Sequence, residues 1–280
     1  LVISSDGILN QLPIEILMLN QQLLFEQFKI KHAQTLTFYK LLKEKNAKAK
    51  SDYKNNLFAV GGAVYNGKSL ASTRNQFPIL KNYEWASLPG TLSEINAATE
   101  FYDKKNTYML VGYDANEQNF MKLNEENILE NYETLLFSTH AYIDLTNNLN
   151  SSIVLSQNNT TEQFDGYLNY GELINLKLNS KLIILSSCES SLGAEISGEG
   201  SVGLPYALFI AGNKSTMATL WPVDDIGTSL FIKNFFKYYQ LEKLDIVDSL
   251  RQTKQDFIKG KFGAEYTQPL FWSSFQYFGM

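Results

Sequence analysis

The stretch Lys181–Gly193 reads K-L-I-I-L-S-S-C-E-S-S-L-G, and it carries the single cysteine of the chain, Cys188, directly after a short apolar run. Continuous apolar runs bounded by small polar residues are typical of strands that are covered on both faces of a parallel sheet. A second such run, T-L-L-F-S-T-H-A at 134–141, contains His140, one of two histidines. In an open α/β sheet, chemistry collects outside the carboxyl ends of the strands. The two runs therefore place Cys188 and His140 at neighbouring strand ends.

Further apolar runs alternate with amphipathic patterns along the chain. Four more strands are expected, at Leu57–Tyr65, Tyr108–Gly112, Ser152–Ser156 and Ser215–Trp221. Helices are expected at 91–105 (with a cap at Ser93), 117–132, 201–211, 223–239 and 244–259, and Leu24–Lys50 reads as a peripheral strand and helix. This alternation predicts one α/β domain over residues 1–280, with a central, mostly parallel sheet of about six strands.

Composition excludes several classes of function. One cysteine cannot form an intramolecular disulfide, and with only two histidines no Cys/His zinc cage can be assembled, so we expect no metal or other cofactor. A lone thiol favours a reducing compartment, and we expect the cytoplasm. The net charge of −5 and the presence of only two arginines argue against nucleic acid as a partner. No apolar stretch reaches the roughly 18 residues of a membrane-spanning helix.

A cysteine and a histidine at one sheet edge can form a nucleophile and its general base. The Cys188 thiolate would attack a carbonyl carbon, and the His140 imidazole would first accept and later return the proton. The backbone N–H groups of Cys188 and Ala141 could stabilise the resulting oxyanion. The alternative is that Cys188 is a small core residue and that His140 is bonded to backbone at a strand end.

Several segments resemble the CHAT domain family, caspase-like peptidase domains related to separase, in order and spacing. They are L-L-F-S-T-H-A (135–141), F-D-G-Y-L-N-Y-G-E-L (164–173), L-I-I-L-S-S-C-E-S-S-L-G (182–193), G-E-G-S-V-G-L-P-Y-A-L-F-I-A-G (198–212) and M-A-T-L-W-P-V-D-D (217–225), with D-G-I-L-N-Q-L-P-I-E-I-L (6–17) and P-L-F-W-S-S-F-Q-Y-F-G (269–279) at the two ends.

The resemblance implies a caspase-like three-layer sandwich and a cysteine endopeptidase that cleaves a protein substrate through a thioester acyl-enzyme. His140 would be the base and Cys188 the nucleophile. Where the family usually has glycine after the histidine, this chain has Ala141, and an alanine with positive φ would be strained. The resemblance also implies a helical repeat region that precedes Leu1, and the absence of an initiator methionine indicates a fragment of a longer chain.

A substrate pocket is implied by the segment L-W-P-V-D-D, which resembles the L-W-x-V-x-D of separase. The final acid, Asp225, would contact a basic side chain before the cleaved bond, with Trp221 as a wall and Asp224 as second choice. Cleavage would then follow Lys or Arg. The alternative is that Asp225 only caps the helix that it precedes. Metacaspase relatives have an acid two residues before the cysteine, whereas this chain has Ser186.

Two rival functions belong to other classes. The first is a catalytically silent interaction module that keeps the same fold. The second is a nucleotide binder, because Gly62–Ser69 satisfies the P-loop formula, although its residues are poorly suited to that loop. Gly198–Gly203 satisfies a dinucleotide formula but lacks the tight turn, and Ser190–Gly203 reads as a flexible active-site loop. His32 reads as structural.

Overall fold

The computed structural model describes residues 1–47, 53–65, 84–187, 190–196, 200–222 and 224–280. Its centre is an eight-stranded sheet of order β1-β4-β15-β14-β11-β7-β5-β6. Neighbouring strands run parallel except for β14 and β15, so the sheet is mostly parallel as predicted. In sheet order the bounds are Val2–Ile3, Lys31–His32, Phe275–Gly279, Ser215–Thr219, Leu182–Leu185, Tyr132–Ser138, Asn55–Gly61 and Thr107–Val111.

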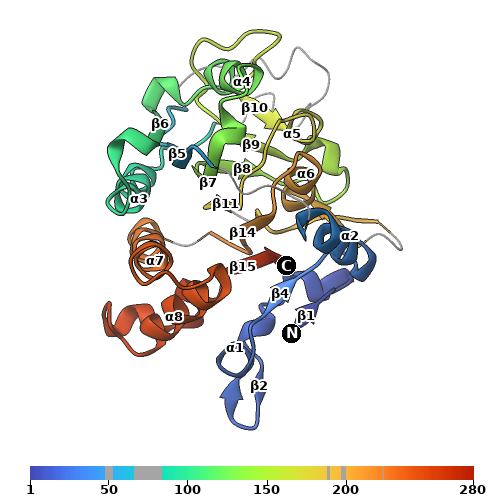
Figure 1. Cartoon of the computed structure of the whole chain (residues 1–280), viewed down its shortest axis with the longest axis vertical. Coiled ribbons are helices and arrows are strands. Elements are labelled where there is room, and N and C mark those ends of the chain that lie inside the picture. The colour runs from blue at the N-terminus through green and yellow to red at the C-terminus, as the bar shows by residue number, and fades with distance from the viewer. Residues whose placement is uncertain (48–52, 66–83, 188–189, 197–199, 223) are drawn as a thin grey trace.

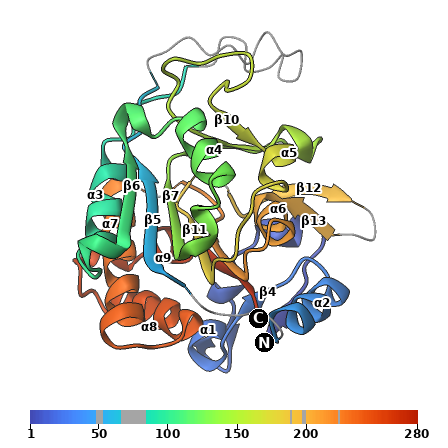
Figure 2. The same cartoon turned by 45° about the horizontal axis from the view of Figure 1, so that its top comes forward.

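Helices cover both faces of this sheet (Figures 1 and 2). One face carries α3 (Gly90–Thr99), α7 (Asp225–Phe236) and α8 (Ile246–Ile258), and the other carries α4 (Glu117–Glu125), α5 (Tyr170–Leu173) and α6 (Leu204–Ile210). The remaining α-helices of the described residues are α1 (Leu24–Gln27), α2 (Leu36–Ala47) and α9 (Pro269–Trp272).

The alternation of side chains along each strand builds two cores. In β11, Leu182 and Ile184 pack into the core beneath α3, α7 and α8, whereas Ile183 and Leu185 pack into the core beneath α4, α5 and α6. All four side chains are fully buried. Because successive side chains of a strand point to opposite faces, a strand with two covered faces has to be apolar throughout. The predicted three-layer arrangement is confirmed.

Three small sheets accompany the central one. The first contains β10 (Tyr167–Asn169), β9 (Ser152–Val154) and β8 (His140–Tyr142), and the others are the hairpins β12–β13 (Gly193–Ile196 and Gly200–Gly203) and β2–β3 (Met18–Leu19 and Gln22–Leu23). The described ends of the segment 190–203 therefore form a hairpin, where the sequence predicted a loop.

The sheet differs from the expected one in its strand count. It has eight strands rather than about six. The peripheral strand and helix expected within Leu24–Lys50 are present as β4 and α2, and β4 joins the central sheet together with β1. The strand β15 lies in the aromatic closing segment, where no strand was expected. The run at 152–156 forms β9, but in a separate antiparallel sheet. The run at 134–141 is split, since β7 ends at Ser138 and β8 begins at His140.

The helix boundaries also differ. The helix expected at 91–105 begins at Gly90 after Pro89 and ends at Thr99, so Ser93 lies inside it and does not cap it. The helix expected at 201–211 begins at Leu204, because the preceding residues pair with β12.

A buried charge cluster joins the N-terminal segment to the C-terminal half. Glu15, His32 and Lys254 are 3%, 5% and 1% exposed, respectively. Lys254 Nζ and His32 Nε2 each lie 3.4 Å from Glu15 Oε1, and Lys254 Nζ also donates to the Phe275 carbonyl at 2.7 Å. Burial alone would disfavour the carboxylate, but Lys254 and His32 outweigh it and lower the pKa of Glu15 to about 2. His32 therefore has the structural position that its sequence context predicted.

We expect Glu15→Gln to destabilise the protein at neutral pH by roughly 3 kcal/mol, since it leaves Lys254 buried without its carboxylate. Chemical denaturation measures this loss, with the exposed Glu130→Gln as control. The folded-state pKa of Glu15 is depressed, so its contribution is present above the unfolded pKa of 4.5 and is lost as the pH falls towards about 2. The deficit of the variant should shrink over that range. A variant as stable as the wild type at neutral pH would contradict this account.

Candidate active site

The carboxyl ends of β7 and β11 lie side by side at one edge of the central sheet. Leu185 is in register with Phe137, and the Ser186 N–H donates to the Phe137 carbonyl at 2.8 Å. His140 follows β7 by two residues, and Ser187 directly precedes Cys188. Cys188 itself lies outside the described residues. The two strands are thus the neighbours that the sequence predicted, and the distance from thiol to imidazole stays a prediction.

The His140 ring is fixed by its surroundings. Its Nε2 lies 2.8 Å from the Ala86 carbonyl oxygen, and its ring centroid lies 4.8 Å from those of Tyr65 and Trp85. The His140 backbone N–H donates to the Tyr65 hydroxyl at 3.2 Å. A carbonyl oxygen only accepts, so Nε2 carries the proton and the lone pair of the neutral ring is on Nδ1. The bond to backbone, anticipated for a structural histidine, therefore leaves a basic nitrogen available.

The charge state of His140 suits a general base. The ring is half-buried, and burial lowers the pKa of His140, while the hydrogen bond to Ala86 opposes that change in part. A pKa below 6.5 means that the neutral imidazole predominates at neutral pH.

Ala141 lies within β8, where it is in register with Ile153 of β9. It is not among the residues with positive φ. Alanine in the place of the family's glycine is therefore unstrained here, because the backbone is extended. The role of its N–H towards an oxyanion stays a prediction.

A pocket lies directly beside the two strand ends, and we call it the strand-end pocket. Thr139, Ser186 and Ser187, the sequence neighbours of the predicted catalytic residues, form part of its wall. The remaining lining residues come from the end of β14, the segment after it, and the α3 and α7 regions, namely Leu88, Thr91, Glu94, Thr219, Trp221, Pro222, Asp225 and Thr228.

Two of the three predicted substrate-binding residues line this pocket. Asp225 accepts a hydrogen bond from the Gly90 N–H at 2.8 Å, and the Trp221 Nε1–H donates to the Leu270 carbonyl at 3.0 Å. Asp224 is exposed, does not line the pocket, and caps α7 by accepting from the N–H groups of Ile226 and Gly227, both at 3.0 Å. The alternative that Asp225 is the cap is therefore wrong, since its neighbour takes that position.

Glu94 is the pocket residue that the sequence reasoning missed. It is 3% exposed, and its Oε2 accepts from the Ser138 hydroxyl at 2.9 Å and from the Ser186 hydroxyl at 2.7 Å. Burial, with a smaller contribution from the nearby Asp225, raises the pKa of Glu94 to about 7, against the opposing effect of the two hydrogen bonds. The sequence did contain a signal for the burial of Glu94, because this residue lies at helical spacing from Thr91 and Ala98 on the buried side of α3.

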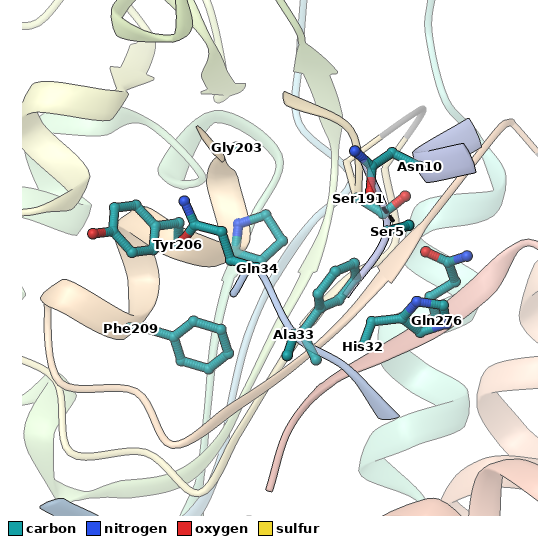
Figure 3. Close-up of a pocket in the computed structure, with 12 residues that line it drawn as sticks. Ser5, Asn10, His32, Ala33, Gln34, Ser191, Gly203, Tyr206, Phe209 and Gln276 are labelled. Carbon is teal, nitrogen blue, oxygen red and sulfur yellow. Dashed lines mark hydrogen bonds between the residues drawn. The ribbon is translucent and has the colours of Figure 1, made fainter. Parts of the chain in front are cut away.

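A second cavity lies apart from His140, against the N-terminal segment (Figure 3). His32 lines it together with Ser191, Gln276 and the aromatic side chains of Tyr206 and Phe209 from α6. Its lining includes neither His140 nor Asp225.

Within the described residues no group of three His, Cys, Asp or Glu side chains could hold a metal ion. The end of the P-loop formula, 66–69, lies outside the part of the chain that the structure describes, as do 198 and 199 of the dinucleotide formula. In that same part of the chain, no helix is long and apolar enough to cross a membrane.

A mostly parallel eight-stranded sheet between two helical layers, with the site at its carboxyl edge, defines a caspase-like α/β protein, as predicted. The model of the CHAT domain family matches residues 1–280, and the chain belongs to that family.

Similar structures include separase of Saccharomyces cerevisiae in its complex with securin, which is 12% identical with a TM-score of 0.55. The similarity covers 96% of this chain and 15% of that chain. Gingipain R, an Arg-specific cysteine proteinase, is 9% identical with a TM-score of 0.51 over 89% of this chain and 54% of that one. At these identities the likeness shows the fold alone.

Among curated proteins, Tetratricopeptide repeat protein 28 of Mus musculus is 32% identical over 69 residues. These residues make up 25% of this chain and 3% of the mouse protein. The chain thus corresponds to a small part of that relative and of separase.

We expect His140 to titrate below 6.5 and to carry its neutral-state proton on Nε2, because burial disfavours the imidazolium and Ala86 accepts the Nε2–H. Heteronuclear NMR of the imidazole nitrogens measures both properties, and loss of the signal in His140→Asn assigns it. A midpoint above 6.5, or an Nδ1–H tautomer, would contradict the geometry.

Proposed function

We propose that this chain is a cysteine endopeptidase with Cys188 as nucleophile and His140 as general base. The observation that carries the proposal is the fixed His140 ring, with its lone pair on Nδ1, at the end of the strand that pairs with the strand leading to Cys188. Neither a metal nor a nucleotide is needed for this chemistry.

The reaction would proceed in two steps. His140 takes the proton of the Cys188 thiol, and the sulfur attacks the carbonyl carbon of the peptide bond, with the N–H groups of Cys188 and Ala141 as donors to the oxyanion. The C–N bond then breaks as His140 returns the proton to the leaving amine, which leaves a thioester. In the second step, water loses a proton to His140 and attacks the thioester, so that an acid and the thiol are released.

The comparisons support this proposal at the level of family and fold. The chain belongs to the CHAT family and shares its fold with separase and gingipain R, the second of which is named as a cysteine proteinase. The mouse relative is named for tetratricopeptide repeats, which supports helical repeats of the same chain as a partner region.

We expect Cys188→Ala and His140→Ala each to lower peptide cleavage by about 10³-fold or more, because nucleophile and base act as one unit. Mass spectrometry of a peptide library incubated with each purified protein measures this loss. Unchanged melting temperatures would show that the fold is intact. Cleavage by Cys188→Ala at the wild-type rate would contradict the proposal, and a folded wild type that cleaves nothing would favour the silent interaction module.

Substrate choice is proposed to depend on Asp225, with Trp221 as a wall of the strand-end pocket. An acid in a pocket beside the scissile bond favours a basic side chain before that bond. Gingipain R, named as Arg-specific, has the same fold and supports this preference. Cleavage would follow Lys or Arg.

We expect Asp225→Asn to lower kcat/KM for peptides with Lys or Arg before the cleaved bond by about 10- to 100-fold, the value of a hydrogen bond to a charged group. The amide oxygen can still accept from Gly90, so the local fold is kept. Alkylation of Cys188 by iodoacetamide should not change. Asp224→Asn is the matched control, since its carboxylate caps α7 outside the pocket. An unchanged rate for Asp225→Asn would remove Asp225 from the substrate site.

A further inference from the structure

Glu94 connects the two strand ends that carry the proposed catalytic residues. Ser138 precedes His140 by two residues, Ser186 precedes Cys188 by two, and both hydroxyls donate to the same oxygen, Glu94 Oε2. Within the described residues, this carboxyl group accepts hydrogen bonds at Oε2 and not at Oε1, and Glu94 lines the strand-end pocket. Glu94 therefore has one oxygen engaged by the protein and the other available to a bound group.

Another buried glutamate, Glu15, lies in a different electrostatic environment. Glu15 has Lys254 and His32 beside it, and its pKa falls to about 2. The described lining of the strand-end pocket contains no lysine, arginine or histidine, and the pKa of Glu94 rises to about 7. A buried acid without a cationic partner is costly, and such groups concentrate at functional sites. A cation brought by a ligand would supply the missing partner.

The described charged groups around Glu94 do not supply this cationic partner. Asp225 of α7 faces it with a like charge, and the groups that reach it from the ends of β7 and β11 are uncharged hydroxyls. The cation that α7 directs towards α3, Lys233, pairs instead with the exposed Glu100 at 2.8 Å.

We propose that Glu94 is a second substrate-binding acid, which holds the cationic end of a lysine or arginine side chain in the strand-end pocket together with Asp225. This inference rests on the proposed peptidase function and adds to it a residue and a dependence on pH. Below about pH 7 Glu94 is protonated and the pocket has one negative charge, whereas above it the pocket has two. The preference for a cation should therefore rise with pH, and binding of the cation at neutral pH should release a proton.

The test compares two peptides that differ only before the cleaved bond, one with arginine and one with the uncharged isostere citrulline. The ratio of their kcat/KM values cancels the titration of the catalytic pair. In the wild type the ratio should rise by about 10-fold from about pH 6 to about pH 8, because a bound cation interacts more strongly with two carboxylates than with one. In Glu94→Gln it should be independent of pH and lower than the wild-type ratio at the higher pH. Glu100→Gln, on the exposed end of the same helix, should behave as the wild type.

If Glu94 only stabilises the two strand ends and does not bind substrate, the experiment gives a different result. Glu94→Gln would then lower kcat/KM equally for both peptides, the wild-type ratio would not change with pH, and the proposal would be overturned. Cleavage that depends on Cys188 but shows no preference for the arginine peptide would also overturn the role of Glu94, while the peptidase function would stand.

A binding measurement makes the inference independent of catalysis. Calorimetry of the Cys188→Ala protein with N-acetyl-arginine amide should show tighter binding by about 10-fold at about pH 8 than at about pH 6, with proton release. The double variant with Glu94→Gln should lose this difference. Equal binding by both proteins at the higher pH would overturn the role of Glu94, whether or not the wild type cleaves peptides.

Discussion

The parallel pairing of β7 with β11 is the constraint on which the site depends. The two strands share both cores, and their in-register pairing brings Ser138 and Ser186 to the same edge of the sheet. Parallel strands end together, so any residue that follows one strand by a few positions lies near its counterpart after the next. The His140 ring is then oriented by Ala86 from outside the sheet.

The contact between α3 and α7 completes the pocket beside these strand ends. Asp225 opens α7 and accepts the N–H of Gly90, the first residue of α3. A Cβ atom at position 90 would lie 2.2 Å from the Asp225 Cβ, so only glycine allows this approach. The same packing brings Glu94, one turn further along α3, against Ser138 and Ser186. One helix contact thus places two acids in one pocket.

The buried glutamates Glu15 and Glu94 show how the environment of a carboxyl group decides its chemistry. Glu15 is ionised because Lys254 and His32 offset its loss of hydration, and it joins segments that are far apart in the chain. Glu94 has hydroxyl donors and a neighbouring acid, so its carboxyl group titrates near neutral pH. The first arrangement stabilises the fold, and the second provides a group that can respond to a ligand.

The sequence by itself determined the layered α/β fold and the adjacency of the runs that contain His140 and lead to Cys188, because strands covered on both faces need unbroken apolar runs. It also indicated that Asp225 lies at a pocket, through motif resemblance. Only the tertiary structure decided that Asp224 caps α7, that Ala86 holds the His140 ring, and that Glu94 enters the pocket. These contacts join residues from separate elements, and the local periodicity of the sequence does not indicate which helix packs beside which strand end. Strand β15 was not predicted for a related reason, since it forms by pairing with β14 and β4, which are distant in the sequence.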